Sequence, residues 1–398
     1  MFTRKGEEKD GSLPTTGYNP SQAMRTLSSR RTSLPESSTM NPDVLVVGGG
    51  PTGLATAIAL RLEGFSVTLV ERRLPPVDKA CGEGIMPGGV PILRHLGVDL
   101  PSRDSFRFHG ILYREGDTVA TARFGGPPGM GVRRTTLHHA LVCRACDLGV
   151  NFLWGRGLRE LLPEGGRVAD GSIRARWTVA ADGANSGIRQ KLGLDGRIRY
   201  QRLGLRRHYG IRPWSSMVEV SFADRCETYV TPIADDQVCV ALLTDDVRPG
   251  FDRLLARFPH LVERLAGGQL VSEARGAGVI FRSARQVVSG RVALVGDAAV
   301  AVDAISGEGV CLGLHQAMAL AHSLRHGDLA EYARVHAGLV RVTMRMTRLL
   351  LLLHRRPQLR RSVLRTFQAW PGLFTGLLAI HTRETSLAGF GARLLHLH

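Results

Sequence analysis

Apolar residues in the first quarter of the chain change from a continuous run to a helical spacing and back again. Residues 44–47 form an unbroken apolar run, which is typical of a strand buried on both faces. After a glycine-rich turn, apolar residues recur at helical spacing between 55 and 62, and residues 66–70 form a second strand-like run. The pattern predicts a strand, a helix and a second strand of one parallel sheet.

The turn between these segments carries a G-x-G-x-x-G motif. Gly48 permits the tight turn, Gly50 leaves room for a pyrophosphate, and Gly53 lets helix and strand pack closely. The helix N-terminus directs N–H groups and a partial positive charge at the phosphates. A glycine loop alone is often only a turn, but here an acid also ends the second strand, where it can bind ribose hydroxyls. The predicted dinucleotide-binding residues are Gly48, Gly50, Pro51, Thr52, Gly53, Glu71 and Arg72.

The middle of the chain predicts an antiparallel sheet inserted into this first domain. Alternating apolar and polar positions indicate strands without long helices between them, at 203–211, 218–222, 228–233 and 238–243. Residues 106–113 and 118–124 alternate like a hairpin, and 125–131 are expected to be a loop. Helices are expected from Arg134 and over 251–265, and a buried run returns at 291–296. This late return predicts that the first domain is discontinuous.

The C-terminal part is predicted to be helical and basic. Apolar residues expected on one helix face are Leu339, Val342, Met346, Leu349, Leu350 and Leu353, and the opposite face carries Arg341, Arg345, Arg348 and Arg355. Each arginine would cost about 2.5–3.5 kcal/mol at the centre of a bilayer, so a membrane span is not expected. The pattern favours an amphipathic helix packed on the core, and a basic helix lying on an anionic membrane is the alternative.

The formal charge of +17 does not by itself indicate nucleic acid. The basic residues are nearly all arginine, and no basic stretch is interleaved with aromatic residues as a base-stacking platform requires. We expect a solvated arginine-rich surface and no nucleic-acid partner. The six cysteines show no disulfide framework, and the C-x-x-C pair of Cys143 and Cys146 has no second pair and no spaced histidines, so no metal site is predicted. No secretory signal is visible, which favours the cytoplasm or the inner face of its membrane.

Further loops combine glycine with an acid or a cysteine. The first reads ACGEGIMP from residue 80 and includes Cys81 and Gly82. The second, ADGANSGIR, contains Asp182 and Gly183, with Ser186 expected to cap a short helix. The third places Gly296 and Asp297 after the late strand, followed by Gly307, Glu308 and Gly309. Ligands bind at such loops because they follow the carboxyl ends of parallel strands.

These motifs, taken in order from about residue 43 to 324, resemble those of the FAD-dependent aromatic hydroxylase (monooxygenase) superfamily, which includes geranylgeranyl reductases and flavin-dependent halogenases. The resemblance implies FAD, with Glu71 on the adenosine ribose, Arg134 on the ribityl or phosphate part and Asp182 near the pyrophosphate. Asp297 would bind the ribityl chain. The backbone N–H groups of 307–309 would face the pyrimidine edge of the flavin, where a helix N-terminus stabilises negative charge.

We therefore predict an α/β fold with a discontinuous Rossmann-like FAD-binding domain, an inserted antiparallel β-sheet substrate domain and a helical C-terminus. The expected FAD-binding segments are 40–105, 132–195 and 286–326, and the substrate domain comprises 106–131 and 196–285. C-terminal helices are expected over 327–398. Residues 1–39 lack apolar periodicity and are expected to be a disordered extension, which a start codon assigned too far upstream would also explain.

The leading functional hypothesis is an NAD(P)H-dependent monooxygenase. In this chemistry NADH or NADPH reduces FAD, and a flavin C4a-hydroperoxide hydroxylates or epoxidises a hydrophobic or aromatic small molecule, such as a secondary metabolite or a lipid-like compound. No second dinucleotide motif is present, so the nicotinamide cofactor would bind transiently. One alternative is a geranylgeranyl-reductase-like alkene reductase, and another is a flavin-binding protein without turnover.

Departures from the hydroxylase pattern favour the reductase and halogenase branches. The chain has Ala304 after Asp303 where hydroxylases commonly have proline, and Cys311 where they commonly have asparagine. Halogenases of this superfamily need a lysine that activates hypohalous acid. Halogenation is not expected here, because residues 106–113 offer no lysine. Weak catalytic candidates are Cys81, Glu308 and His208, and for each a structural role is the competing interpretation. The substrate, the choice of NADH or NADPH and the oligomeric state stay open.

Overall fold

The computed structural model describes residues 39–246 and 248–382. The predicted N-terminal extension therefore lies outside the described residues as far as residue 38. Thr39, its last residue, is described and pairs in a strand with Ser172.

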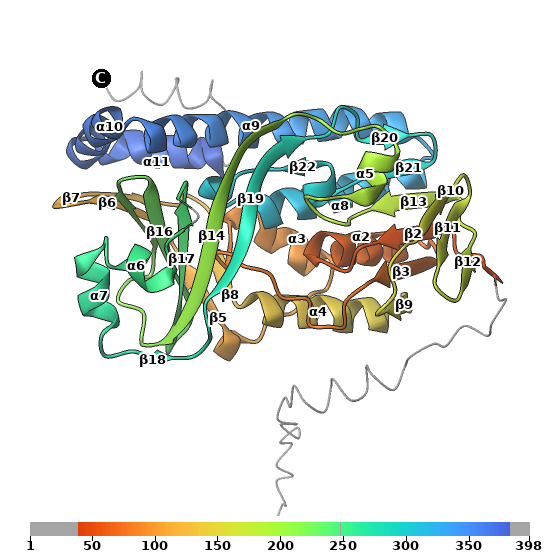
Figure 1. Cartoon of the computed structure of the whole chain (residues 1–398), viewed down its shortest axis with the longest axis horizontal. Coiled ribbons are helices and arrows are strands. Elements are labelled where there is room, and N and C mark those ends of the chain that lie inside the picture. The colour runs from red at the N-terminus through yellow and green to blue at the C-terminus, as the bar shows by residue number, and fades with distance from the viewer. Residues whose placement is uncertain (1–38, 247, 383–398) are drawn as a thin grey trace, which may run out of the picture. The chain divides into compact units, whose positions relative to one another are not determined.

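A six-stranded sheet organises the first domain (Figure 1). Its strand order is β20 (Val288–Ser289), β21 (Val292–Leu294), β13 (Trp177–Ala180), β2 (Val44–Val47), β3 (Val67–Glu71) and β9 (Asn151–Trp154). All neighbouring pairs are parallel except β20 with β21. Helix α2 (Pro51–Leu62) packs against α4 (Arg134–Asp147) and α8 (Gly309–Arg325). The strand–helix–strand unit predicted from the apolar pattern is confirmed.

The second domain is built on a nine-stranded sheet. Its order is β22 (Val300–Ala301), β19 (Arg275–Ser283), β14 (Ile198–Gly210), β17 (Gln237–Thr244), β16 (Cys226–Ala234), β15 (Val218–Ala223), β6 (Gly110–Glu115) and β7 (Thr118–Arg123), with β18 (Gln269–Leu270) paired to β14. The pairs are antiparallel except β6 with β15, which is parallel. Strands β14 to β19 lie in sequence between β13 and β21, which confirms an inserted sheet. The exact domain boundaries remain predictions.

Two smaller sheets complete the strands of the described residues. One joins β4 (Gly84–Ile85), β8 (Gly129–Val132) and β5 (Ser105–Phe108), and the other joins β1 (Thr39–Met40), β12 (Gly171–Ile173), β11 (Gly165–Val168) and β10 (Glu160–Leu162). The loop predicted over 125–131 is therefore wrong at its end, where β8 begins. A side chain at Gly131 would place its Cβ 1.8 Å from the Pro232 carbonyl oxygen, so this glycine allows close strand approach and does not mark a turn.

Short helices connect the sheets at α3 (Val90–His95), α5 (Gly187–Lys191), α6 (Phe251–Leu255) and α7 (Pro259–Leu265). Four 3₁₀ turns accompany them at Pro87–Gly89, Ser102–Asp104, Gly296–Ala298 and Ala304–Ser306. Ser186 caps α5 as predicted, because its side chain accepts a hydrogen bond from the Arg189 N–H. The helix predicted over 251–265 is two helices, and the second begins at Pro259.

Three helices end the described chain: α9 (Leu329–Arg355), α10 (Pro357–Ala369) and α11 (Pro371–His381). Helix α9 packs against α8, and α10 and α11 pack against β7 (Figure 1). The predicted α/β fold with its inserted sheet and helical C-terminus is confirmed.

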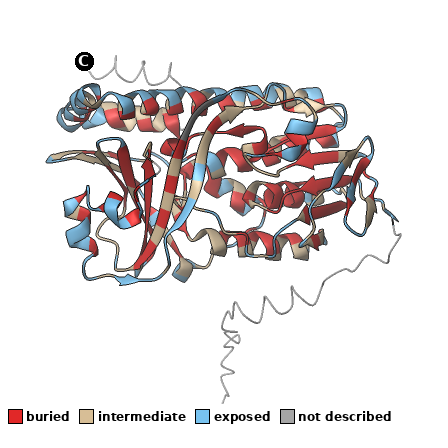
Figure 2. Cartoon of the chain, in the orientation of Figure 1, coloured by how far each residue is buried: buried red, intermediate tan, exposed pale blue. Residues whose placement is uncertain are grey.

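The predicted buried face of α9 is wrong. Leu349 is 42% exposed, and the other five apolar residues expected there are only half-buried. The face that is buried carries Tyr332, His336, Val340, Thr343, Met344, Thr347, Leu351 and His354. Several of these polar groups have internal partners, as when the Thr347 hydroxyl donates to the Thr343 carbonyl at 2.8 Å. The arginines do lie on the exposed face, as predicted (Figure 2).

Candidate functional site

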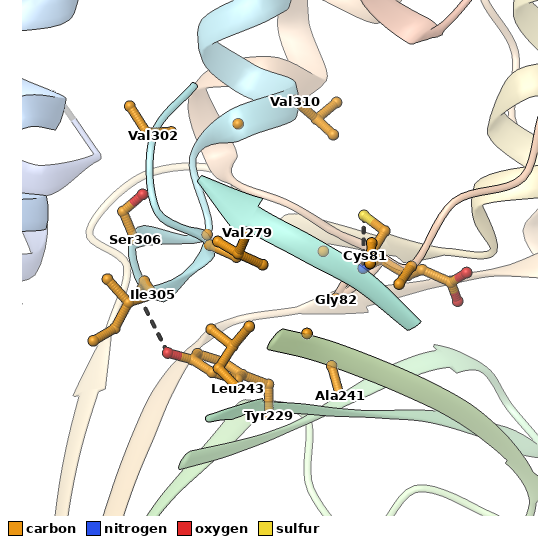
Figure 3. Close-up of a pocket in the computed structure, with 18 of the residues that line it drawn as sticks. Cys81, Gly82, Tyr229, Ala241, Leu243, Val279, Val302, Ile305, Ser306 and Val310 are labelled. Carbon is orange, nitrogen blue, oxygen red and sulfur yellow. Dashed lines mark hydrogen bonds between the residues drawn. The ribbon is translucent and has the colours of Figure 1, made fainter. Parts of the chain in front are cut away.

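A cavity of about 350 Å³ lies where the glycine loop, the ACGEGIMP loop and the nine-stranded sheet meet. One wall is backbone, from the start of α2, from Gly183 and from the turn before α8. The opposite wall is largely apolar, with side chains of β14, β16, β17 and β19 (Figure 3). The cavity therefore joins the predicted cofactor loops to the inserted sheet.

The three motif glycines have different physical roles in the structure. Gly48 has φ +113°, and a Cβ there would lie 2.3 Å from the Ala181 carbonyl oxygen. A Cβ at Gly53 would lie 1.9 Å from the Gly48 carbonyl oxygen, so helix and loop pack at that point. A Cβ at Gly50 would meet nothing within 4 Å, because Gly50 faces the cavity. Only the second glycine leaves space that a ligand can fill.

Other cavity glycines share this open space. A Cβ would also meet nothing within 4 Å at Gly82, Gly183, Gly307 and Gly309. Helix α2 begins after Gly50, has Pro51 in its first turn and has no side-chain cap, so its first N–H groups are available to an anion. These open glycines and the start of α2 form a cradle of exposed backbone. The cradle fits a dinucleotide whose phosphates lie at the start of α2 and whose flavin ring lies at the start of α8.

The predicted acids of the first domain bind backbone groups. Glu71 accepts hydrogen bonds from the N–H groups of Gly49 at 2.8 Å and Arg73 at 2.9 Å, which fixes the carboxylate beside the glycine loop. Asp182 accepts one from the Ile188 N–H at 3.3 Å, and its Oδ1 is buried without a partner. An orphaned carboxylate oxygen beside the cradle is the kind of group that a bound polar ligand satisfies.

Arg134 and Asp297 lie on the cavity wall, as the resemblance implies. The Arg134 backbone N–H donates to Glu83 Oε1 at 3.0 Å, and its side-chain Nε is buried without a partner. Asp297 pairs with Lys79 at 3.3 Å, and both side chains stay partly exposed. These groups can therefore serve a phosphate or a polyol without breaking a buried interaction.

The loop before α8 is held from outside the cavity. Asp303 caps it by accepting from the Ile305 N–H at 3.0 Å, and Gly307 ends the turn at φ +66°. Glu308 is buried and lies 3.6 Å from His381 of α11, so its side chain does not line the cavity. The Tyr229 hydroxyl donates to the Ile305 carbonyl at 3.4 Å (Figure 3). Burial keeps this hydroxyl neutral by raising its pKa well above the ordinary value.

A buried ion network ties the same loop to α9. Arg202 on β14 donates to Asp303 through Nε at 3.1 Å and to Glu227 through Nη1 at 2.6 Å. His354 of α9 in turn contacts Glu227 Oε2 at 2.5 Å and Asp245 at 3.3 Å. Burial opposes the charge of His354, but the hydrogen bond and charge of Glu227 outweigh it and raise the His354 pKa. The network holds the loop, the sheet and the C-terminal helix together.

A second buried network stands behind the ACGEGIMP loop. Glu83, at φ +59°, accepts from Arg134 N–H and contacts His208 Nε2 at 2.7 Å. Arg133 Nη2 and Arg206 Nη1 lie 3.0 Å and 3.2 Å from His208 Nδ1. Because arginine can only donate, Nδ1 must be an acceptor and the imidazole carries its proton on Nε2. The Nε2–H of His208 thus donates to the Glu83 carboxylate.

The same cluster brings potential metal ligands together. Atoms of Glu83, His208 and Cys239 all lie within 4.8 Å of one another. The two arginines beside this histidine oppose a cation there, and the Nε2 that a metal would need already donates to Glu83. The geometry is better explained as a hydrogen-bonded support for the loop that carries Cys81.

The cavity collects most, but not all, of the predicted site residues. Those on its wall are Gly50, Pro51, Thr52, Gly53, Cys81, Gly82, Arg134, Gly183, Gly296, Asp297, Gly307 and Gly309. Those not on its wall are Gly48, Glu71, Arg72, Asp182, Glu308 and His208. Arg72 is exposed. Of the weak catalytic candidates, only Cys81 lines the cavity, and His208 contacts Glu83, which lines it.

Sequence reasoning missed several cavity residues. Lys79 directly precedes the ACGEGIMP segment and Glu83 lies within it, Tyr229 comes from β16, and His381 comes from the last described helix. Glu83 gave one signal, an acid between two glycines in a loop expected at the site. Tyr229 and His381 gave none, because strand and helix periodicity does not reveal which residue reaches a distant loop.

Comparisons with known proteins agree with this geometry. A family model described as an FAD binding domain matches residues 41–219. The chain is 30% identical over 334 residues to 6-methylpretetramide 4-monooxygenase of Streptomyces rimosus, covering 73% of this chain and 77% of that protein. It is 27% identical over 321 residues to menaquinone reductase of Mycobacterium tuberculosis, covering 73% and 78%. A geranylgeranyl bacteriochlorophyll reductase-like structure from Thermoplasma acidophilum matches with a TM-score of 0.66 at 20% identity, covering 79% and 88%.

Proposed function

Because the chain belongs to the FAD-dependent monooxygenase family, we propose that it is an NAD(P)H-dependent monooxygenase that hydroxylates or epoxidises a hydrophobic or aromatic small molecule. Bound FAD supplies the redox chemistry, and the chain supplies the binding site, the orientation and the exclusion of water. The single observation that carries the proposal is one continuous cavity whose two walls differ. Bare backbone suited to the cofactor faces a wall of apolar side chains suited to the substrate.

The apolar wall indicates the class of substrate. Ile111, Val218 and Val220 line the cavity from β6 and β15. Leu243 and Val279 line it from β17 and β19, as Figure 3 shows. Burying a planar or aliphatic compound against these side chains gains about 25 cal/mol per Å² of apolar surface. Tyr113 and Tyr229 bring phenolic hydroxyl groups to this wall. Burial raises the pKa of Tyr113 to about 12, so it stays a neutral hydrogen-bond donor.

The chain's own residues would hold FAD as follows. The first N–H groups of α2 would bind the phosphates, and Glu71, which is held beside the glycine loop, would bind the adenosine ribose. Asp297 and Arg134 line the cavity and would bind the ribityl part of FAD. The N–H groups that begin α8 would stabilise negative charge at the pyrimidine edge of the flavin, because a helix N-terminus carries a partial positive charge.

NADH or NADPH would deliver electrons without a dedicated domain. In the described residues, the six-stranded sheet carries one glycine-motif turn, at the start of α2. A nicotinamide cofactor would therefore bind transiently, at the side of the cavity where Lys79 remains partly exposed.

The test combines the purified protein, FAD, NADPH and a panel of aromatic and lipid-like compounds. A substrate should increase both NADPH oxidation and oxygen uptake, and one oxygen atom from labelled dioxygen should appear in its product. A product without labelled oxygen, formed equally well under nitrogen, would contradict a monooxygenase.

An alkene reductase is the second candidate, and a specific observation favours it. Cys81 lines the cavity in the CGEG form of the loop, and a relative is named a menaquinone reductase. For this candidate, the same assay under nitrogen should give a product heavier by two hydrogens. The two outcomes are exclusive for any one substrate, so mass spectrometry of the product decides between them.

A further inference from the structure

A second groove, of about 700 Å³, lies between α9 and the segment 283–288. Its wall carries four arginines, Arg285, Arg341, Arg345 and Arg348. All four are exposed, and no carboxylate among the described residues forms an ion pair with any of them. Four cations gathered without counter-charge repel one another, so the groove is suited to an anion.

A buried nitrogen on the wall of this groove points to the same conclusion. His336 is only 6% exposed, and its Nε2 has no hydrogen-bond partner. A buried polar atom without a partner is uncommon in folded proteins, and an anionic oxygen in the groove would satisfy it. Burial lowers the pKa of His336 to about 4, so the neutral ring would donate through N–H. Four exposed arginines and one buried imidazole whose Nε2 lacks a partner therefore line the same groove.

The surface around the groove is one-sided in charge. Residues 332–382 contain nine arginines and neither aspartate nor glutamate. Three of the nine form ion pairs: Arg360 and Arg361 pair with Glu115, and Arg334 pairs with Asp328. The groove arginines of α9 are exposed. Exposed apolar side chains accompany them, since Leu349 and Leu352 are 42% and 46% exposed and Trp370 between α10 and α11 is 69% exposed.

We propose that this face docks on an anionic phospholipid bilayer, with a lipid phosphate in the arginine groove and Leu349 and Leu352 inserted between headgroups. Cations that attract an anionic surface, combined with apolar side chains that enter it, give reversible binding at the interface. In the described residues no helix has the length and apolar content for crossing a bilayer, so attachment would be peripheral. Leu350 of the same helix lines the substrate cavity, which places the apolar site next to the docking face.

The test is co-sedimentation of the holoprotein with vesicles. We expect binding to a mixture of phosphatidylcholine and phosphatidylglycerol, no binding to phosphatidylcholine alone, and release at high salt. The variant R341Q/R345Q/R348Q should bind the anionic vesicles roughly 100-fold more weakly, at about fivefold per arginine. A second variant, L349Q/L352Q, should weaken binding at low salt without changing the salt dependence.

A matched control removes the same charge elsewhere. R94Q/R174Q/R253Q changes three arginines that are exposed and form no ion pair among the described residues, and it should bind vesicles as the unchanged protein does. Equal loss in both triple variants would overturn the proposal, as would equal binding to neutral vesicles. Inositol hexakisphosphate or duplex DNA that binds the groove while anionic vesicles do not would overturn it too.

Docking is measured without turnover, so the two proposals fail separately. Protein that binds anionic vesicles but oxygenates no substrate would refute the proposed function alone. Protein that turns over substrate but ignores vesicles would refute the docking surface alone.

Discussion

Replacing Gly50 with alanine tests the cofactor site with little disturbance of the fold. Gly50 has φ −73° and ψ 173°, which any residue adopts, and an added Cβ meets nothing within 4 Å. Removing a glycine also reduces the freedom of the unfolded chain, which is worth about 0.4–1 kcal/mol of stability at a compatible site. The unliganded variant should therefore fold as well as the unchanged protein.

The cost appears when FAD binds. The added methyl group occupies the space against which the pyrophosphate rests, and it pushes the phosphates away from the first N–H groups of α2. A hydrogen bond to a charged group is worth about 1.5–3 kcal/mol. Losing one such bond corresponds to FAD binding weakened by roughly 10- to 150-fold. Titration of the apoprotein with FAD, followed by flavin fluorescence or calorimetry, measures this change directly.

The chain offers a closely matched control. Gly250 is also the residue before a helix, with φ −72° and ψ 174°, and a Cβ there meets nothing within 4 Å. It does not line the cavity, so Gly250→Ala should leave FAD affinity unchanged. If Gly50→Ala binds FAD as tightly as Gly250→Ala does, the phosphates do not lie at the start of α2, and the reasoning about the cradle is wrong.

Three further predictions concern the buried networks. Arg202→Met should lower the free energy of unfolding by about 3–5 kcal/mol, because it leaves Asp303 charged, buried and without its arginine partner. The control Arg248→Gln, at an exposed ion pair, should change the free energy of unfolding by less than about 0.5 kcal/mol. Urea denaturation measures both changes, and equal effects would contradict the importance of the buried network. The protonated form of His354 adds stability that is fully present below its ordinary pKa of 6.5 and is lost as pH rises through the raised pKa. The free energy of unfolding should therefore decrease as pH rises from 6.5 through the raised pKa, and His354→Gln should make this decrease smaller. A pH profile that is the same in His354→Gln would contradict this. In Glu83→Gln, an amide oxygen that keeps the hydrogen bond from the Arg134 N–H leaves the amide NH₂ group facing the N–H of His208, so two donors face each other. We expect FAD to bind about tenfold more weakly, with a small change in melting temperature. Unchanged FAD affinity would mean that this loop does not position the cofactor.

The sequence was most informative where one local rule decides the structure. The continuous apolar run at Val44–Val47 and the glycines at 48, 50 and 53 predict a buried strand, a tight turn and a helix without reference to distant residues. Ser186 predicts its cap for the same reason, since the hydrogen bond reaches only three residues ahead. The early βαβ unit and the order of the cofactor loops could therefore be foreseen.

Features decided by distant contacts could not be read in this way. Leucines 349 to 353 suggest a buried face on α9, but tertiary partners bury Thr343, Thr347 and His354 in place of Leu349. A hydrogen bond within the helix satisfies the Thr347 hydroxyl, and Glu227 and Asp245 partner His354. The spacing of apolar residues along the chain does not reveal such partners. The role of Glu83 could not be predicted, because its partner His208 lies 125 residues away in sequence.

Strand β14 carries a further consequence. Arg202, Arg206 and His208 are buried on one of its faces, and through Asp303 and Glu83 they hold the loops on either side of the cavity. Adding or deleting a single residue would turn all three charged or polar groups to the opposite side, because side chains alternate along a strand. The register of this one strand therefore fixes both loops at once, whereas substitutions of apolar residues on the neighbouring strands would leave Arg202, Arg206 and His208 in place.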